Sequence, residues 1–192
     1  MTENSVILGL PRGGVVVAAA LGLRLRLPVA AYLVRKLRAP INEEFAFGAV
    51  AEDGPPLLDT DTLGALRIGS SYVNAEVAAQ RAEIERQRQA YGGRTKLPNL
   101  TSSDVVLVDD GIATGATVEA AVRGLRGRGC RSIGVATPVA SGLAVERLRP
   151  LCDWAEVLST PPDFFAVGQY YRQFPQVTDE EVLACLRGLP ER

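Results

Sequence analysis

The chain has 192 residues, 47% of them apolar and 22% charged, which is enough material for one domain with a substantial core. Its formal net charge is -1, so it has no strongly basic field to hold a nucleic-acid backbone. It has no histidine, and this excludes Ser-His and Cys-His nucleophilic chemistry as well as histidine-ligated metal sites.

The cysteines and the apolar runs exclude further classes of protein. Cys130, Cys152 and Cys185 have neither metal-ligand nor disulfide spacing, so we interpret them as buried or half-buried thiols. Residues 1–4 lack a basic leader region, and the longest apolar run, residues 15–23, is shorter than the ~18 residues of a membrane span. We therefore expect a cytoplasmic protein with no membrane and no nucleic-acid partner.

The first third of the chain predicts two strands around a helix. Residues 5–10 predict a short buried strand. The segment Pro11-Arg12-Gly13-Gly14 should end this strand, and a helix is predicted over residues 15–25. After Pro28, residues 29–37 predict a second strand that ends in Arg35-Lys36. The stretch over residues 38–71 is ambiguous, but two short strands, residues 47–51 and 56–58, could pair as a hairpin.

The next segment, residues 74–91, predicts a helix with Asn74 as its N-cap and Gly92-Gly93 as its stop. The other faces carry Gln, Glu and Arg, so we expect the helix to be largely solvated. Its apolar positions form only a thin stripe, Val77, Ile84 and Tyr91.

Strands and helices alternate with short links over the rest of the chain, and this predicts an α/β fold with a doubly wound, Rossmann-like parallel sheet. We expect one domain over residues 1–192. Ser141 and Thr178 are the expected caps of its last two helices, the second through a capping box with Glu181. The predicted elements are strands 104–108, 132–136 and 154–159, and helices 117–128, 142–149 and 179–188.

The segment from Val105 to Thr117 is a buried strand, two acids, a loop of small residues and a helix start, placed where open α/β sheets bind ligands. Free N–H groups at the helix start, with the Thr114 and Thr117 hydroxyls, suit a phosphate dianion. Carboxylates only accept hydrogen bonds and suit a vicinal diol. Together they predict a site for ribose 5-phosphate. Its candidate residues are Asp109, Asp110, Gly111, Ile112, Ala113, Thr114, Gly115, Ala116 and Thr117.

Two commoner phosphate loops do not fit this segment. The Walker A loop needs Gly-Lys followed by Ser or Thr, and no lysine follows Lys96. The dinucleotide fingerprint places its acid well after the glycines, whereas Asp109 and Asp110 precede them. The remaining alternative is an Asp-Asp turn that merely caps a helix.

The segment from Val105 to Thr117 closely resembles the diphosphate-sugar signature of type I phosphoribosyltransferases, and the resemblance extends over most of the chain. Pro11-Arg12-Gly13-Gly14 resembles the family's pyrophosphate loop, although such a sequence can also be a simple turn. Arg35-Lys36 resembles the basic pair that meets the diphosphate, with a solvated strand end as the alternative. The chain most resembles a bacterial and archaeal subgroup whose acceptor is unassigned.

The resemblance implies transfer of a 5-phosphoribosyl group from 5-phosphoribosyl 1-diphosphate to a nitrogenous base or small amine, with release of pyrophosphate. It also implies a homodimer and a bound Mg²⁺, which Asp109 and Asp110 would contact indirectly, through ribose hydroxyls or water. The implied catalytic residues are Lys36, Asp110 and Arg94. The implied diphosphate ligands are Arg12, Gly13, Gly14, Arg35, Lys36, Arg88 and Tyr91.

Two rival functions stay open: a non-catalytic sensor of the same ligand, and an unrelated enzyme of a phosphorylated sugar. The family's mobile lid is expected at the end of the helix over residues 74–91, where Gly92-Gly93 would hinge and Arg94 and Lys96 would close. A glycine-ended helix with basic residues near its C-terminus is the alternative. If the lid lies elsewhere, we expect it within residues 38–71.

The acceptor is open to two weaker inferences. Residues 161–192 are expected to contribute a small hood, in which aromatic side chains could stack a planar base or could form the underside of the last helix. Ala113 replaces the aspartate with which hypoxanthine-guanine enzymes exchange a proton, so we predict little or no activity on those purines. The aromatic side chains are Phe164, Phe165, Tyr170, Tyr171 and Phe174.

Overall fold

A computed structural model describes residues 4–40, 46–92, 97 and 99–189. Its main sheet has the strand order β2-β1-β6-β7-β8, and each neighbouring pair is parallel, which confirms the predicted fold class. The strand order changes direction between β1 and β6, and such a switch point is where open α/β sheets bind ligands. The strands are β1 (Ser5–Gly9), β2 (Val29–Ala31), β6 (Asp104–Val108), β7 (Ser132–Val139) and β8 (Trp154–Ser159).

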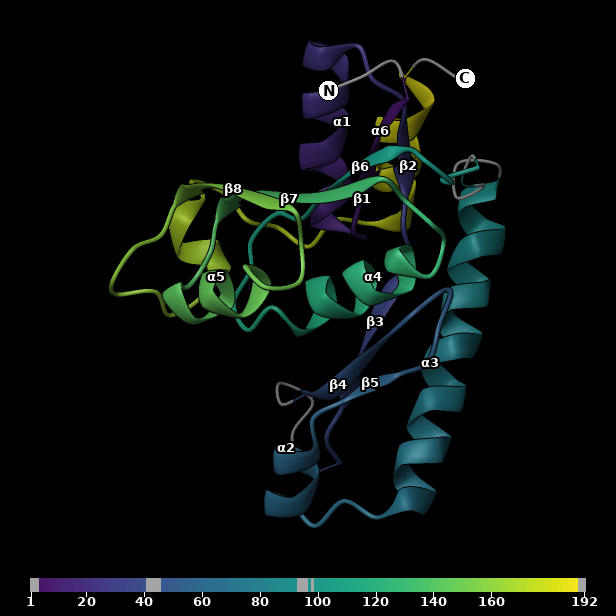
Figure 1. The fold of residues 1–192 in the computed structure, drawn as a ribbon, viewed down its shortest axis with the longest axis vertical. Coiled ribbons are helices and arrows are strands. Elements are labelled where there is room, and N and C mark those ends of the chain that lie inside the picture. The colour runs from purple at the N-terminus through teal and green to yellow at the C-terminus, as the bar shows by residue number, and fades with distance from the viewer. Residues whose placement is uncertain (1–3, 41–45, 93–96, 98, 190–192) are drawn as a thin grey trace.

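Helices cover both faces of this sheet (Figure 1). On one face α1 (Gly13–Leu25) and α6 (Asp179–Arg187) pack against strand residues such as Val106. On the other face α4 (Ala116–Arg126) and α5 (Gly142–Leu148) pack against residues such as Val105 and Leu107. Alternation along β6 therefore sends side chains into two separate apolar cores, as expected of a strand buried on both faces.

A second, three-stranded antiparallel sheet lies beside α4 (Figure 1). Its strands are β3 (Val34–Arg38), β4 (Ala46–Ala51) and β5 (Leu57–Leu58), and α2 (Thr60–Ala65) and α3 (Ser70–Tyr91) follow it. The predicted hairpin is confirmed, because β4 and β5 pair antiparallel. The helix α2, which Asp59 caps through the amides of Asp61 and Thr62, was not predicted.

The prediction of one strand over residues 29–37 was wrong. The chain leaves the parallel sheet after β2 and joins the antiparallel sheet at β3. The break falls at Tyr32 and Leu33, both fully buried, where the Tyr32 hydroxyl donates to Asp53 and the Leu33 amide donates to Glu52. Hydrogen bonds to side chains of a distant segment thus stabilise the turn. The turn itself contains no glycine or proline that could have indicated it from the sequence.

The long helix α3 begins earlier than predicted. It starts at Ser70 with Gly69 as its N-cap, so Asn74 lies inside the helix rather than at its cap. Val73, Ile84, Gln87 and Tyr91 are its buried residues, and the solvated character that the sequence predicted is confirmed.

Other predicted features are confirmed. The Ser141 hydroxyl accepts from the Ala144 amide, and Thr178 opens α6 in a capping box with Glu181. The three cysteines are free, with Cys152 buried and the other two half-buried. Among the described helices none combines the length and the apolar character that crossing a bilayer needs.

Candidate functional site

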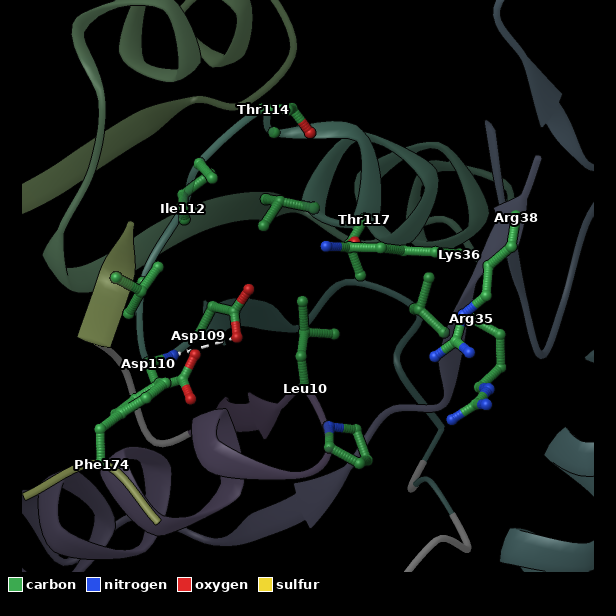
Figure 2. A pocket seen from close by; sticks show the side chains of 17 residues that line it. Leu10, Arg35, Lys36, Arg38, Asp109, Asp110, Ile112, Thr114, Thr117 and Phe174 are labelled. Atoms are coloured by element: carbon green, nitrogen blue, oxygen red, sulfur yellow. Dashed lines mark hydrogen bonds between the residues drawn. The ribbon is translucent and has the colours of Figure 1, made fainter. Parts of the chain in front are cut away.

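A cavity of about 380 Å³ opens at the switch point, beyond the carboxyl ends of β1 and β6 and beside β3 (Figure 2). It brings together the start of the loop after β1, the loop from β6 to α4, the strand β3, and two residues of the C-terminal segment, Val167 and Phe174. Every residue of the predicted ribose 5-phosphate site lines it except Ala116, which is the first residue of α4.

Gly13 and Gly14 lie directly against the two acids. A Cβ atom at Gly13 would overlap the Asp110 carboxylate, and one at Gly14 would lie 2.7 Å from the Val108 carbonyl oxygen. The predicted pyrophosphate loop and the acid pair are therefore in contact, and only glycine lets the start of α1 approach β6 this closely.

The carboxylates of Asp109 and Asp110 form the floor of the cavity, and both residues are half-buried. Burial raises the pKa of Asp109, and the negative charge of Asp110 raises it further. Burial also raises the pKa of Asp110, against the lowering effect of backbone amides and of Lys36. Two carboxyl groups in this setting resist ionisation together, so a cation or a hydroxyl donor beside them is favoured.

The loop after Asp110 is held from the side away from the cavity. The Ser141 hydroxyl donates to the Ala113 carbonyl at 2.5 Å, and the Arg147 guanidinium donates to the Thr114 carbonyl at 3.3 Å. In a trans peptide the N–H group points opposite to the C=O group. The amides of Thr114 and Gly115 therefore point away from α5, on the side where both residues line the cavity.

The start of α4 lies beside this loop. Gly115, its N-cap, has φ 78°, and no side chain caps the helix. The first-turn amides and the positive end of the helix dipole are thus available to a phosphate, and the Thr117 side chain lines the cavity beside them.

The sequence did not indicate the support behind this loop. Arg147 also donates through Nε to Glu119 at 2.6 Å, and Glu119 is 6% exposed. A second arginine, Arg123, donates to the other oxygen of the same carboxylate at 2.9 Å. The buried Glu119 therefore anchors Arg147, which in turn holds the Thr114 carbonyl.

The opposite wall of the cavity is basic and comes from the second sheet. Arg35, Lys36 and Arg38 all line it from β3, and Lys36 extends into the cavity (Figure 2). Arg35 is partly tied to α3, since its Nε donates to Gln80 at 3.0 Å. Burial lowers the pKa of Arg35. This wall is suited to a polyanion such as a diphosphate.

Several predicted diphosphate ligands do not reach this cavity. Arg12 lines a neighbouring cavity instead. Arg88 pairs with Glu52 at 3.0 Å, and Tyr91 is 1% exposed with its hydroxyl bonded to Asp179 at 2.7 Å. The family resemblance had implied these two residues as ligands, but α3 packs against the second sheet and α6, where both have other partners. Gly93, Arg94 and Lys96 lie outside the described residues.

Of the C-terminal aromatic residues, Tyr171 and Phe174 line the two neighbouring cavities. Phe164, Phe165 and Tyr170 line neither of them, and Phe164 stacks on Tyr170. Val167, in the short 3-10 helix η2 (Val167–Tyr170), packs on Gly111, where a Cβ atom would overlap it. The Tyr171 hydroxyl donates to the Asp110 carbonyl at 2.6 Å, and the Tyr171 and Phe174 rings are 4.9 Å apart. The helix α6 packs on α1 and α3, and a hood formed by residues 161–192 stays a prediction.

Comparison with known proteins gives a consistent picture. A family model described as "Phosphoribosyl transferase domain" matches residues 1–173. Rv0571c of Mycobacterium tuberculosis (strain ATCC 25618 / H37Rv), provisionally named a phosphoribosyl transferase, is 41% identical over 182 residues, which are 94% of this chain and 41% of that protein. The chain therefore spans less than half the length of this relative.

A solved structure resembles the chain over almost its whole length. TT1426 from Thermus thermophilus is 46% identical, with a TM-score of 0.79, and the match covers 98% of this chain and 89% of that one.

Proposed function

The chain belongs to the phosphoribosyl transferase domain family, and we propose that it transfers the 5-phosphoribosyl group from 5-phosphoribosyl 1-diphosphate to a nitrogenous base or small amine, releasing pyrophosphate. One observation carries the proposal. A phosphate-type loop, a pair of carboxylates and a basic wall surround a single cavity, and this donor presents a phosphate, a diol and a diphosphate to match them.

Each part of the cavity has a matching part of the donor. The amides of Thr114 and Gly115 and the first turn of α4 would hold the 5-phosphate. Asp109 and Asp110 would accept hydrogen bonds from the ribose hydroxyls. The cations of β3, Lys36 foremost, would neutralise the diphosphate at the other side of the sugar.

The transfer then needs positioning more than covalent chemistry from the protein. The bond from ribose C1 to the diphosphate oxygen breaks, and its electron pair leaves with pyrophosphate. The lone pair of the acceptor nitrogen forms the new bond to C1. The proton that this nitrogen loses passes to the Asp110 carboxylate and from there to solvent. Lys36 counters the charge that builds up on the leaving oxygen.

Mg²⁺ fits this donor set. Among the described residues no group of three or more acidic, cysteine or histidine side chains could hold a metal alone. Asp109 and Asp110 offer two carboxylates, and Mg²⁺ usually binds one or two carboxylates together with waters and substrate phosphates. We propose that these two residues hold it with the donor, where it would neutralise diphosphate charge.

The proposal is tested by separating donor binding from turnover. Calorimetric titration with 5-phosphoribosyl 1-diphosphate and Mg²⁺ should show one tight site, and an assay of pyrophosphate release should show an acceptor-dependent rate across a panel of bases and amines. A protein that does not bind the donor contradicts the site assignment. Tight donor binding without any acceptor-dependent release would instead favour a non-catalytic sensor.

A further inference from the structure

A second cavity, of about 440 Å³, adjoins the first. It lies between the first turn of α1 and residues 171–177, and Asp110 and Phe174 line both cavities. A molecule in the second cavity can therefore meet a sugar in the first across the Asp110 carboxylate.

The lining of the second cavity is mostly apolar. Val16 and Val17 come from α1, and Pro175 and Val177 face them from the C-terminal segment. The tilted pair of Tyr171 and Phe174 adds two aromatic rings. Such walls favour a flat apolar group, because aromatic and aliphatic side chains bury a ring well.

Two charged residues interrupt this apolar lining: Asp110, at the boundary with the first cavity, and Arg12. Arg12 lines the cavity, and among the residues that the structure describes its guanidinium has neither a hydrogen bond nor an ion pair. Asp179, the nearby acid, is already engaged by Tyr91 and Arg86. The start of α1 also lacks a side-chain cap, so its dipole adds positive potential at the same place. An anionic group of a ligand would find an unpaired cation there.

The position of the second cavity suits the geometry of the transfer. The basic wall of β3 lies on one side of the first cavity, and Phe174 lies on the other (Figure 2). A displacement at a sugar carbon brings the nucleophile to the face opposite the leaving group. With the diphosphate against Lys36, an acceptor would approach from the side of Phe174, where the second cavity opens.

Building on the proposed function, we propose that the second cavity binds the acceptor, and that the acceptor is a flat, apolar molecule carrying a carboxylate that pairs with Arg12. The acceptor nitrogen bonds to C1 as the diphosphate leaves with its electron pair, and the proton that this nitrogen loses passes to solvent. The Arg12 side chain then selects the acceptor, and the diphosphate is left to the cations of β3.

Matched probes test the inferred charge. Binding of benzoate and benzamide, and of pyridine-3-carboxylate and pyridine-3-carboxamide, can be measured by saturation-transfer NMR in the presence of ribose 5-phosphate and Mg²⁺. Each carboxylate should bind at least fivefold more tightly than its amide. The variant Arg12→Gln should remove that preference, whereas Arg24→Gln, an exposed arginine on the same helix, should preserve it. Equal binding of acid and amide in the wild-type protein contradicts the proposal.

Two further measurements locate the probe and separate this inference from the proposed function. Val16→Trp should fill the cavity and abolish binding of the carboxylates, with ribose 5-phosphate affinity unchanged; carboxylate binding that survives this change places the probe elsewhere and overturns the proposal. Arg12→Gln should leave the affinity for 5-phosphoribosyl 1-diphosphate within twofold of wild type. A tenfold loss of donor affinity in this variant would show that Arg12 binds the diphosphate and would overturn the inference. Failure of the wild-type protein to bind the donor would instead refute the proposed function.

Discussion

The loop between β6 and α4 and the strand β3 face each other across one cavity, yet they are held in different ways. The loop belongs to the five-stranded sheet, and Ser141 and Arg147 fix its carbonyls from behind. The strand β3 belongs to a three-stranded sheet, and its exposed Lys36 has no hydrogen bond or ion pair among the described residues.

The difference separates two tasks. A fixed loop whose amides already point into the cavity loses little entropy when it binds a phosphate, so it suits recognition of the part of the donor that stays. A flexible lysine can follow a diphosphate as it leaves, and its charge contributes most when negative charge develops. On this account the two walls recognise different ends of the donor.

The largest effect is expected at the floor between the walls. Asp110→Asn keeps the size of the side chain but removes the charge that accepts the ribose hydroxyls and holds a metal. Affinity for 5-phosphoribosyl 1-diphosphate should fall by more than tenfold, about 1.4 kcal/mol or more. Calorimetry with Mg²⁺ present measures it, with Asp61→Asn, an exposed acid on α2, as the matched control. Unchanged affinity in Asp110→Asn would remove the acids from the site.

The next effect should divide the two ends of the donor. Lys36→Met keeps the length of the side chain and removes its charge, so pyrophosphate should bind about tenfold more weakly, while ribose 5-phosphate should bind as before. Arg187→Gln, an exposed arginine on α6, is the control for a change of net charge. If both ligands weaken equally, the basic wall does not act on the diphosphate alone.

The reverse pattern is expected on the opposite wall. Arg147→Met releases the Thr114 carbonyl, and the loop amides lose their fixed direction. Ribose 5-phosphate should bind about three- to tenfold more weakly, corresponding to one or two neutral hydrogen bonds, with pyrophosphate unaffected. Arg149→Met, an exposed neighbour at the end of α5, controls for general effects on that helix. Weakening of both ligands together would indicate loss of structure instead of loss of positioning.

Local motifs allowed the sequence to predict one wall far better than the other. The residues from Asp109 to Thr117 are contiguous in sequence, so the ligand groups that they suit could be inferred from adjacent residues alone. Ser141 was predicted only as a helix cap, and its second bond to Ala113, 28 residues away in sequence, needed the fold. The same holds for Arg147, whose partner Glu119 looks like an ordinary surface acid of a helix.

Orientation was the other source of error. Arg12 lies in the predicted motif but lines a different cavity, because a loop sequence does not fix the direction in which its residues face. The break at Tyr32 was missed since the run from Val29 to Val34 is apolar throughout and is interrupted by hydrogen bonds to Glu52 and Asp53. Such partners, about 20 residues away in sequence, leave no local signal.

A smaller effect concerns stability and pH. The pKa of Asp109 is raised in the folded protein by burial, so the folded state holds this proton more strongly than the unfolded state does. Stability from this group is therefore greatest below its unfolded pKa of ~3.9 and falls as pH rises towards the folded pKa. Asp109→Asn should raise the Tm at pH 8, and the gap should close towards pH 4. A lower Tm at pH 8 would mean that the charge is stabilised in the fold.

The smallest effect on binding is expected at Arg88, on α3 behind the basic wall. The sequence grouped it with the diphosphate ligands, whereas the structure pairs it with Glu52, whose side chain is 3% exposed. Arg88→Met should therefore leave the affinity for 5-phosphoribosyl 1-diphosphate within twofold of wild type. If donor affinity falls tenfold instead, Arg88 reaches the diphosphate when the donor is bound, and the comparison of the two walls must include α3.

The same variant should lose stability, because Glu52 keeps a buried charge without its partner. Burial raises the pKa of Glu52 even with Arg88 present, so removal of the arginine should raise it further. We expect a loss of about 1–2 kcal/mol at pH 8, or roughly 2–4 °C of Tm per kcal/mol. Since the protonated acid needs no partner, the loss should shrink as pH falls through the folded pKa.

Glu52→Gln removes the charge, so the double variant with Arg88→Met should lose much less stability than the sum of the losses in the two single variants. Additive losses at pH 8 would show that the pair contributes no coupling and that Arg88 stabilises the fold only through its aliphatic stem.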